Sequence, residues 1–217
     1  MGLNDIEAVV RCWELSGVST LDAGATPQEL KNAVRKLGRQ PPDELMTLYS
    51  YCNGGEILEG NIQLYPLDGT ELSLLTAADF LRNHQWPIPQ ELILFAGDGQ
   101  GGSFGLWLPE PHIGRLLVVE VGELFEGGAL AVTGTSLSGF LRGRSAYYAL
   151  LLDVPEVAST SLGVPKTLTR KPAEELDDDD YEAFMRWANP GLPDFPVSSY
   201  EARLTADDVR RLARLSG

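Results

Sequence analysis

Apolar residues recur at helical spacing in the first quarter of the chain, and two segments there carry signals that start and end helices. Thr26-Pro27-Gln28-Glu29 is a capping box with proline at the first helical position, and Gly38 follows the last apolar residue of the stripe. Pro42 starts a second stripe, which ends in Asn53-Gly54-Gly55, residues that favour the left-handed conformation found at helix C-termini. An earlier amphipathic stretch predicts a helix over Asp5–Leu15.

Beyond Gly55 the period of the apolar residues falls towards two, which is typical of strands with one buried face. The pattern predicts strands over Ile62–Leu67, Leu92–Ala96, Phe104–Leu108, Leu116–Val121 and Ala129–Thr133. A short helix over Ala77–His84 interrupts them; Thr76 is expected to cap it with Asp79 as box partner, and Phe80 and Leu81 to face inward. A longer helix is expected from about Leu137.

This order of elements predicts an α+β fold: a single domain with a mostly antiparallel sheet flanked by helices, over residues 1–152. A largely helical extension, residues 153–217, is expected to pack on it, with helices starting at Asp177 and Thr205. The sheet is expected to direct six side chains against the helices of Leu30/Val34 and Leu48/Tyr49: Leu64, Leu94, Phe104, Leu106, Val118 and Val132.

The stretch LILFAGDGQGGSFGLWLP, residues 92–109, contains a possible dinucleotide fingerprint, because Gly97, Gly99 and Gly102 satisfy G-x-G-x-x-G. A dinucleotide loop must open a helix, whose N-terminus binds the pyrophosphate. Here alternating residues follow the loop, and Pro109 and Pro111 would interrupt a helix within two turns. The stretch therefore favours two strands joined by a glycine-rich hairpin loop.

Charge is distributed unevenly along the chain, which has 217 residues and a formal net charge of −14. Between Asp43 and Glu126 the chain has thirteen acidic residues but only two basic ones, Arg82 and Arg115, which gives a net charge of −11. Such a field repels nucleic acid and attracts a basic protein, although an acidic surface can also serve only solubility.

With no apolar run long enough for a bilayer and no signal peptide, we expect a cytoplasmic protein without membrane contact. Cys12 and Cys52 are expected to be buried, reduced thiols.

Motifs for catalysis, metals and cofactors have little support. The acidic run Asp177–Asp180 lacks the glycine and the terminal glutamate of a calcium loop. VTGTSLSG is similar to a nucleophile elbow, but Ser138 replaces its second glycine, and both histidines precede Ser136, so both serines are expected to cap a helix. Acid pairs such as Asp68/Glu71 could serve a glycosidase, yet chance explains them in so acidic a window. We expect no catalytic residue, metal or cofactor.

Three segments in the same order resemble the SUKH superfamily, which includes fungal cell-wall-assembly regulators of the Smi/Knr type and many bacterial immunity proteins. The likeness covers about residues 26–152. The residues that carry it are Pro42, Leu45, Leu48, Tyr49, Asn53, Gly54 and Gly55 in the first helix and its turn, Phe95, Ala96, Asp98, Gly99 and Gly102 around the glycine loop, and Ser136, Phe140 and Leu141 in the late helix.

The resemblance implies a non-catalytic α+β binding module, most often an immunity protein that neutralises a toxin, many such toxins being nucleases or deaminases. A regulatory or scaffold interaction protein of the same fold is the alternative, and an enzyme is a third possibility.

The acids expected to steer a basic partner are Asp68, Glu71, Asp98, Glu110, Glu123 and Glu126. Trp107, on the outward phase of its strand, and Trp86 are the candidate anchors, with ordinary packing as the alternative. The sequence leaves the oligomeric state open.

Overall fold

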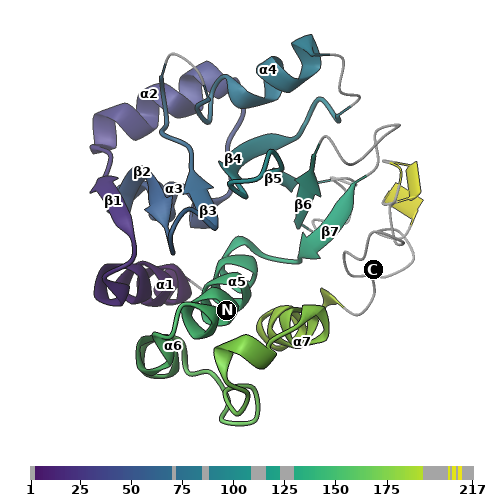
Figure 1. Ribbon diagram of the computed structural model, residues 1–217. Coiled ribbons are helices and arrows are strands. Elements are labelled where there is room, and N and C mark those ends of the chain that lie inside the picture. Colours follow the sequence, from purple (N-terminus) through teal and green to yellow (C-terminus); the bar gives the residue numbers. More distant parts are fainter. Residues whose placement is uncertain are drawn as a thin grey trace.

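A single antiparallel sheet organises the protein (Figure 1). The computed structural model describes residues 3–69, 72–84, 88–108, 116–122 and 130–192, together with 205, 207–208 and 210–211. Within these residues each strand pairs with the next along the chain, so spatial order equals chain order. The strands are β1 (Thr20–Ala23), β2 (Cys52–Ile57), β3 (Ile62–Leu64), β4 (Ile93–Gly97), β5 (Ser103–Trp107), β6 (Leu117–Val121) and β7 (Ala131–Gly134). The predicted α+β class is confirmed.

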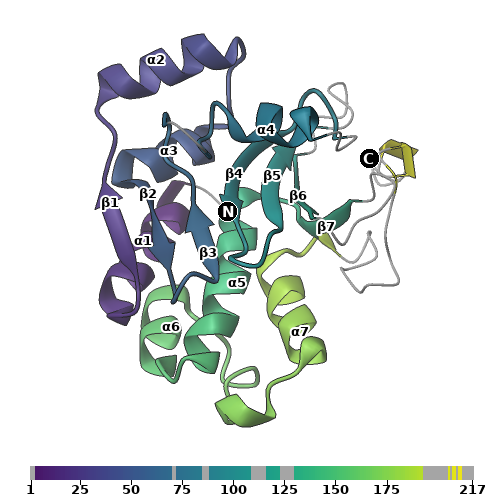
Figure 2. The same cartoon turned by 45° about the horizontal axis from the view of Figure 1, so that its top comes forward.

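The helices lie along two sides of this sheet. Figure 1 shows α1, α5, α6 and α7 along its lower side and α2 and α4 along its upper side, and Figure 2 shows β1 as the outermost strand. Their bounds are α1 (Leu3–Ser16), α2 (Pro27–Leu37), α3 (Asp43–Tyr51), α4 (Ala77–Asn83), α5 (Leu137–Leu151), α6 (Pro155–Leu162) and α7 (Asp178–Ala188), with a 3-10 turn at Ala173–Glu175. Among the described residues no helix is both long and apolar enough to cross a bilayer.

The centre of the core is formed by α5. The ring of Phe140 lies 4.9 Å from that of Phe104 and 6.1 Å from that of Phe95, and the indole of Trp13 donates to the hydroxyl of Ser145 at 2.8 Å. All six predicted sheet residues are buried. The predicted partner helices are only half right, because α3 buries Leu45, Leu48 and Tyr49 whereas Leu30 and Val34 of α2 stay half-buried.

Strands β1 and β2 were not predicted, and the interpretation of Asn53-Gly54-Gly55 as a helix C-terminus is wrong. Helix α3 ends at Tyr51, and the chain continues as β2 from Cys52. Gly54 and Gly55 have φ of 119° and 140°, and a Cβ at Gly55 would lie 2.3 Å from the carbonyl oxygen of Thr20. The glycines therefore allow β1 to lie close against β2, rather than ending a helix.

The caps predicted at Thr26 of α2 and Ser136 of α5 are confirmed, whereas those predicted at Ser138 and at Thr76 of α4 are wrong. Thr26/Glu29 and Asp177/Asp180 form the reciprocal bonds of capping boxes, and Thr205 and Asp208 do so near the C-terminus. Thr76 makes no side-chain cap on α4, because its hydroxyl accepts from Ser73 N at 3.1 Å instead. Phe80 is 44% exposed, so its expected inward position is also wrong.

Candidate interaction surface

Tyr49 and Asn53, in the first of the three segments that resemble the SUKH superfamily, form hydrogen bonds inside the fold. The hydroxyl of Tyr49 donates to the carbonyl of Tyr65 at 2.7 Å, and the hydroxyls of Tyr65 and Ser103 lie 2.9 Å apart. Asn53 Oδ1 accepts from the backbone N–H of Leu67 at 2.9 Å. Burial raises the pKa of both tyrosines, so both hydroxyls stay protonated. These residues position the chain that follows β3.

The glycine loop is a hairpin turn, as predicted. Asp98 Oδ1 accepts from Gln100 N at 2.7 Å and from Gly102 N at 2.8 Å, and β5 follows at once. Gly99 has φ of 76°, and a Cβ there would lie 2.6 Å from the carbonyl oxygen of Gly60. The loop thus packs on the turn between β2 and β3 and opens no helix for a pyrophosphate. The carboxylate of Asp98 is half-exposed, but its hydrogen bonds shape the loop.

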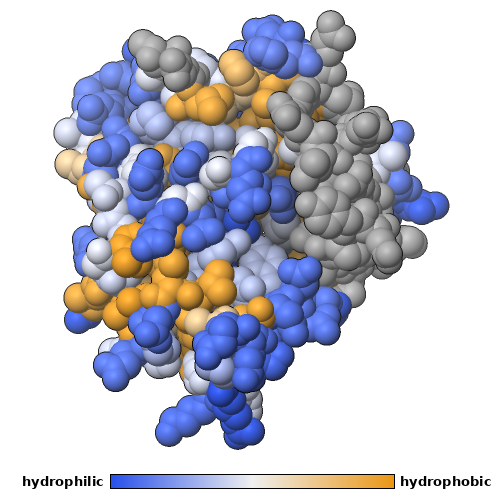
Figure 3. Space-filling view, viewed as in Figure 1, coloured by the Kyte–Doolittle hydropathy of each residue, from blue (hydrophilic) through white to orange (hydrophobic). Residues whose placement is uncertain are grey.

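The open part of the sheet carries a shallow acidic hollow. Its volume is about 410 Å³, and it is lined by Thr20, Asp22, Gly55, Glu56, Gln63 and Leu64. Thr20 pairs with Glu56, and Glu56 with Gln63, so these three side chains share one face of β1–β3. All three are exposed, as is Asp22. Figure 3 shows hydrophilic side chains over this region and a hydrophobic patch below it, over α1 and α5.

The two carboxylates of this hollow are not neutralised by any described side chain. No ion pair of the part of the chain that the structure describes includes Asp22 or Glu56. Asp22 lies over the backbone of Gly54, where an added Cβ would be 2.9 Å from its Oδ2. A glycine at that position therefore leaves room for the carboxylate on the surface of the sheet. We call Thr20, Asp22, Glu56 and Gln63 the acidic sheet face.

Of the acids expected from the sequence, Asp68 and Asp98 lie among the described residues. Asp68 is exposed and forms an ion pair with Lys36, whose ammonium lowers the pKa of that carboxyl. Its charge is therefore partly compensated, whereas no described cation pairs with Asp22. The other four expected acids and one tryptophan lie outside the described residues: Glu71, Trp86, Glu110, Glu123 and Glu126.

Trp107 is buried, with 1% of its surface exposed, so the expectation that it faces outward is wrong. The alternation placed its side chain opposite Phe104 and Leu106, but both faces of the sheet are covered at this end: every residue of β4, β5 and β7 is buried. The guanidinium carbon of Arg210 lies 5.4 Å from the centre of its indole ring. Trp107 therefore acts as a packing residue.

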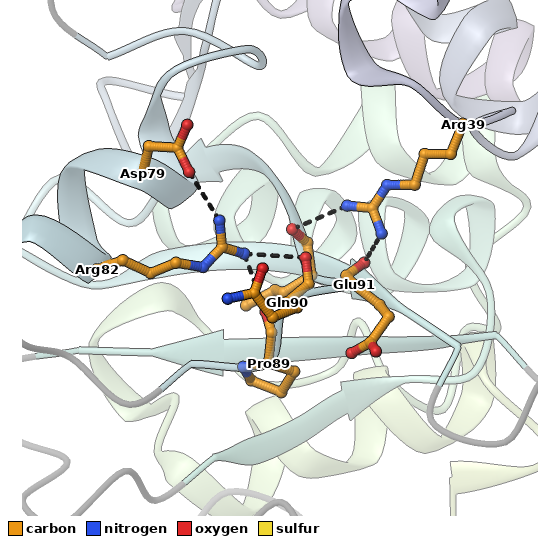
Figure 4. A network of polar contacts seen from close by, with 7 residues as sticks. Arg39, Asp79, Arg82, Pro89, Gln90 and Glu91 are labelled. Atoms are coloured by element: carbon orange, nitrogen blue, oxygen red, sulfur yellow. Dashed lines mark hydrogen bonds and ion pairs between the residues drawn. The ribbon is translucent and has the colours of Figure 1, made fainter.

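A second hollow, of about 320 Å³, lies between the end of α2, α4 and the start of β4. Figure 4 shows Arg39 and Arg82 converging on the backbone that enters β4. Arg82 donates to the carbonyls of Pro89 and Gln90, each at 3.0 Å, and binds Asp79 at 2.8 Å. Arg39 donates to the carbonyls of Glu91 and Leu92. Both guanidinium groups are thus used to fix this segment.

Side chains suited to catalysis have structural roles where they are described. Burial raises the pKa of Cys12 and Cys52 to about 12 each, so neither thiol is a nucleophile near neutrality. Ser136 caps α5 by accepting from Gly139 N at 3.0 Å, and Ser138 donates to Glu44 at 2.6 Å. No three His, Cys, Asp or Glu side chains in the described parts are placed to hold a metal ion.

Comparison with protein families gives a match over residues 24–143 to the model of the SMI1/KNR4 family (SUKH-1). The chain belongs to the SMI1/KNR4 family. The match confirms the resemblance and spans α2 to the middle of α5, including both glycine segments and the Ser136 cap. Helices α1, α6 and α7 lie outside it. A comparison with curated proteins finds no match.

The acidic sheet face of this family member was not found from the sequence. Asp22 belongs to a four-residue strand, TLDA, too short to show a period of two. Glu56 follows two glycines that were interpreted as a helix end. The available signal was the capping box at Thr26: because it fixes the start of α2, Asp22 belongs to the connection before that helix.

Proposed function

We propose that this SMI1/KNR4 protein is a non-catalytic immunity protein that neutralises a basic bacterial toxin by direct binding at the acidic sheet face. One observation carries the proposal: Asp22 and Glu56 stand exposed on an open sheet face without an ion-pair partner among the described residues. Members of this family are often immunity proteins, which supplies the toxin as the class of partner.

The electrostatics of the whole chain support a basic partner. A net charge of −14 gives a field that attracts cations over roughly a Debye length, about 8 Å at physiological salt. Two uncompensated carboxylates beside a shallow hollow give lysine or arginine side chains a place to dock. An acidic partner, or a nucleic acid, would meet repulsion at the same place.

Steering charges set the rate of association, whereas affinity generally depends on a few buried anchors. Trp86 remains the proposed aromatic anchor, and Glu71, Glu110, Glu123 and Glu126 remain proposed contributors to steering. Asp98 is a weaker candidate than the sequence suggested because its oxygens hold the hairpin loop. The toxin is expected to contact β1–β3 first.

The proposal is tested first in the gene neighbourhood, where we expect a toxin gene beside that of this protein, and then with the toxin domain that this gene encodes. The two are expressed together and separately in a bacterial host, and growth and copurification are measured. Co-expression is expected to restore growth and yield a stable complex. The charge-reversed variant Asp22→Lys/Glu56→Lys is expected to lose both, while Glu174→Lys/Glu175→Lys, an equal change on an exposed 3-10 turn, keeps them.

Growth that stays inhibited, with no complex formed, would contradict the immunity function. A gene neighbourhood without any toxin would instead favour the regulatory or scaffold protein of the same fold. If the toxin binds but both charge-reversed variants protect equally well, the immunity function stands and the acidic sheet face is not where the toxin docks.

A further inference from the structure

Among the described residues, the first strand of the sheet pairs with another strand on one side only. Strand order places β1 at the edge, paired with β2 alone, and Figures 1 and 2 both show it as the outermost strand. Thr20, Asp22 and Ala23 are exposed and Leu21 is half-buried. In an edge strand every second residue directs its N–H and C=O away from the sheet. In the described part of the chain no other strand pairs with this edge.

The edge adjoins the acidic sheet face, and this decides what it can pair with. A second copy of the chain would bring its own Asp22 beside the first, so like charges would oppose an edge-to-edge dimer of two molecules that each carry −14. A strand with basic residues would place opposite charges across the new pair. Charge therefore selects a basic partner over self-pairing.

We propose that the free edge of β1 binds an extended basic segment of the toxin, which adds one more strand to the sheet. This inference rests on the proposed function and names how the partner docks. Backbone hydrogen bonds supply the attachment, and alternate side chains of the added strand supply the selectivity. Lysine or arginine beside Asp22 and Thr20 reaches the acidic hollow, and apolar residues on the other face meet Leu21.

The register of β1 limits the length of the added strand. Thr20 and Leu21 pair regularly with Glu56 and Gly55, and the register then shifts before Ala23. Such a bulge bends the strand and interrupts regular pairing beyond it. The added strand therefore pairs over no more than the four residues of β1, and regularly only beside Thr20 and Leu21, and so short an edge is a poor template for unrelated proteins.

Hydrogen exchange measured on the complex with the adjacent-gene toxin domain tests this directly, without any variant. Backbone amides in residues 20–23 that exchange quickly in the free protein are expected to slow at least tenfold in the complex. A complex that forms and restores growth, yet leaves these amides unchanged, overturns the inference and leaves the proposed function standing. Slowing in the free protein that grows with its concentration would assign the edge to self-pairing and overturn it as well.

Proline substitution gives a second, independent measurement. Because successive residues direct their N–H groups to opposite sides, Thr20→Pro and Leu21→Pro differ in which side loses a donor. The variant that loses an outward-facing N–H is expected to keep the urea midpoint of the wild type and to weaken toxin binding at least tenfold. The variant that loses an N–H facing β2 is expected to unfold at a lower urea concentration. If the well-folded variant binds normally, the inference fails, and if no toxin binds even the wild type, the inference fails together with the proposed function.

Discussion

Arg144 on α5 donates two hydrogen bonds to the backbone carbonyl of Asn61, from Nε at 3.2 Å and from Nη2 at 3.0 Å. Its Nη1 donates to the hydroxyl of Tyr181 on α7 at 3.1 Å. The guanidinium carbon lies 4.5 Å from the ring centre of Phe104 and 4.9 Å from that of Tyr148. One buried cation therefore joins the β2–β3 turn, the central helix α5 and helix α7, which lies outside the family match.

We expect Arg144→Met to lower the free energy of unfolding by about 2 kcal/mol, measured by urea denaturation. The carbonyl of Asn61 loses its donors, and the aromatic rings lose their contact with a cation. Removal of a buried charge restores part of the lost stability. Arg35→Met, at an exposed position on α2, is the matched control and should change stability by less than about 0.5 kcal/mol. Equal or greater stability of Arg144→Met would contradict the role assigned to these contacts.

The sequence was informative where a signal is local and failed where the cause is a contact between distant segments. The capping box at Thr26 and the hairpin around Asp98 depend on residues within five positions and were predicted correctly. The role of Gly55 depends on Thr20, which lies 2.3 Å from the position of its missing Cβ, and no local pattern shows that approach. The alternation along the strand predicts on which face of the sheet Trp107 lies, but the burial of Trp107 depends on what covers that face.

The N-terminus of α5 is stabilised by an acid from another helix. Glu44 on α3 accepts from Leu137 N at 3.0 Å through Oε2 and from the Ser138 hydroxyl at 2.6 Å through Oε1. We expect Glu44→Ala to lower the free energy of unfolding by about 2 kcal/mol, because buried donors at a helix start lose an anionic acceptor. Glu44→Gln, which keeps an acceptor, should lose about half as much in the same urea titration. Equal losses in the two variants would show that the anionic charge, rather than the remaining acceptor or the shape of the side chain, carries the effect.

Glycine at position 55 is expected to be indispensable for the sheet. A Cβ there would lie 2.3 Å from the carbonyl oxygen of Thr20, at a φ of 140°. Gly55→Ala should cost more than about 3 kcal/mol of stability, since β1 must move away. Gly38→Ala, where φ is also positive but no atom lies within 4 Å, should cost about 1 kcal/mol. Thermal unfolding of both variants checks the difference, and similar losses would show that backbone strain alone matters.

Alkaline pH is expected to destabilise the protein through its buried thiols. In the folded state burial raises the pKa of Cys12 and Cys52 from 9.0 to about 12. Above about pH 9 the unfolded chain loses these protons while the folded chain keeps them, so the free energy of unfolding falls as pH rises towards 12. The slope approaches about 1.4 kcal/mol per pH unit for each thiol. Urea titrations between pH 8 and 10.5 should show it, and Cys12→Ala/Cys52→Ala should flatten it.

Association with the toxin should depend on Asp22 and Glu56 through their charge alone. Asp22→Asn/Glu56→Gln is expected to slow association several-fold and to flatten its salt dependence, because exposed charges steer encounters over the Debye length. Its melting temperature should stay within about 1 °C of the wild type, since unpaired exposed carboxylates contribute little to stability. Glu174→Gln/Glu175→Gln removes the same net charge from an exposed turn outside the sheet and is the control. Stopped-flow kinetics over a range of salt concentrations compares the three proteins. If both double variants slow association equally, the toxin responds to the net charge of −14 rather than to the acidic sheet face.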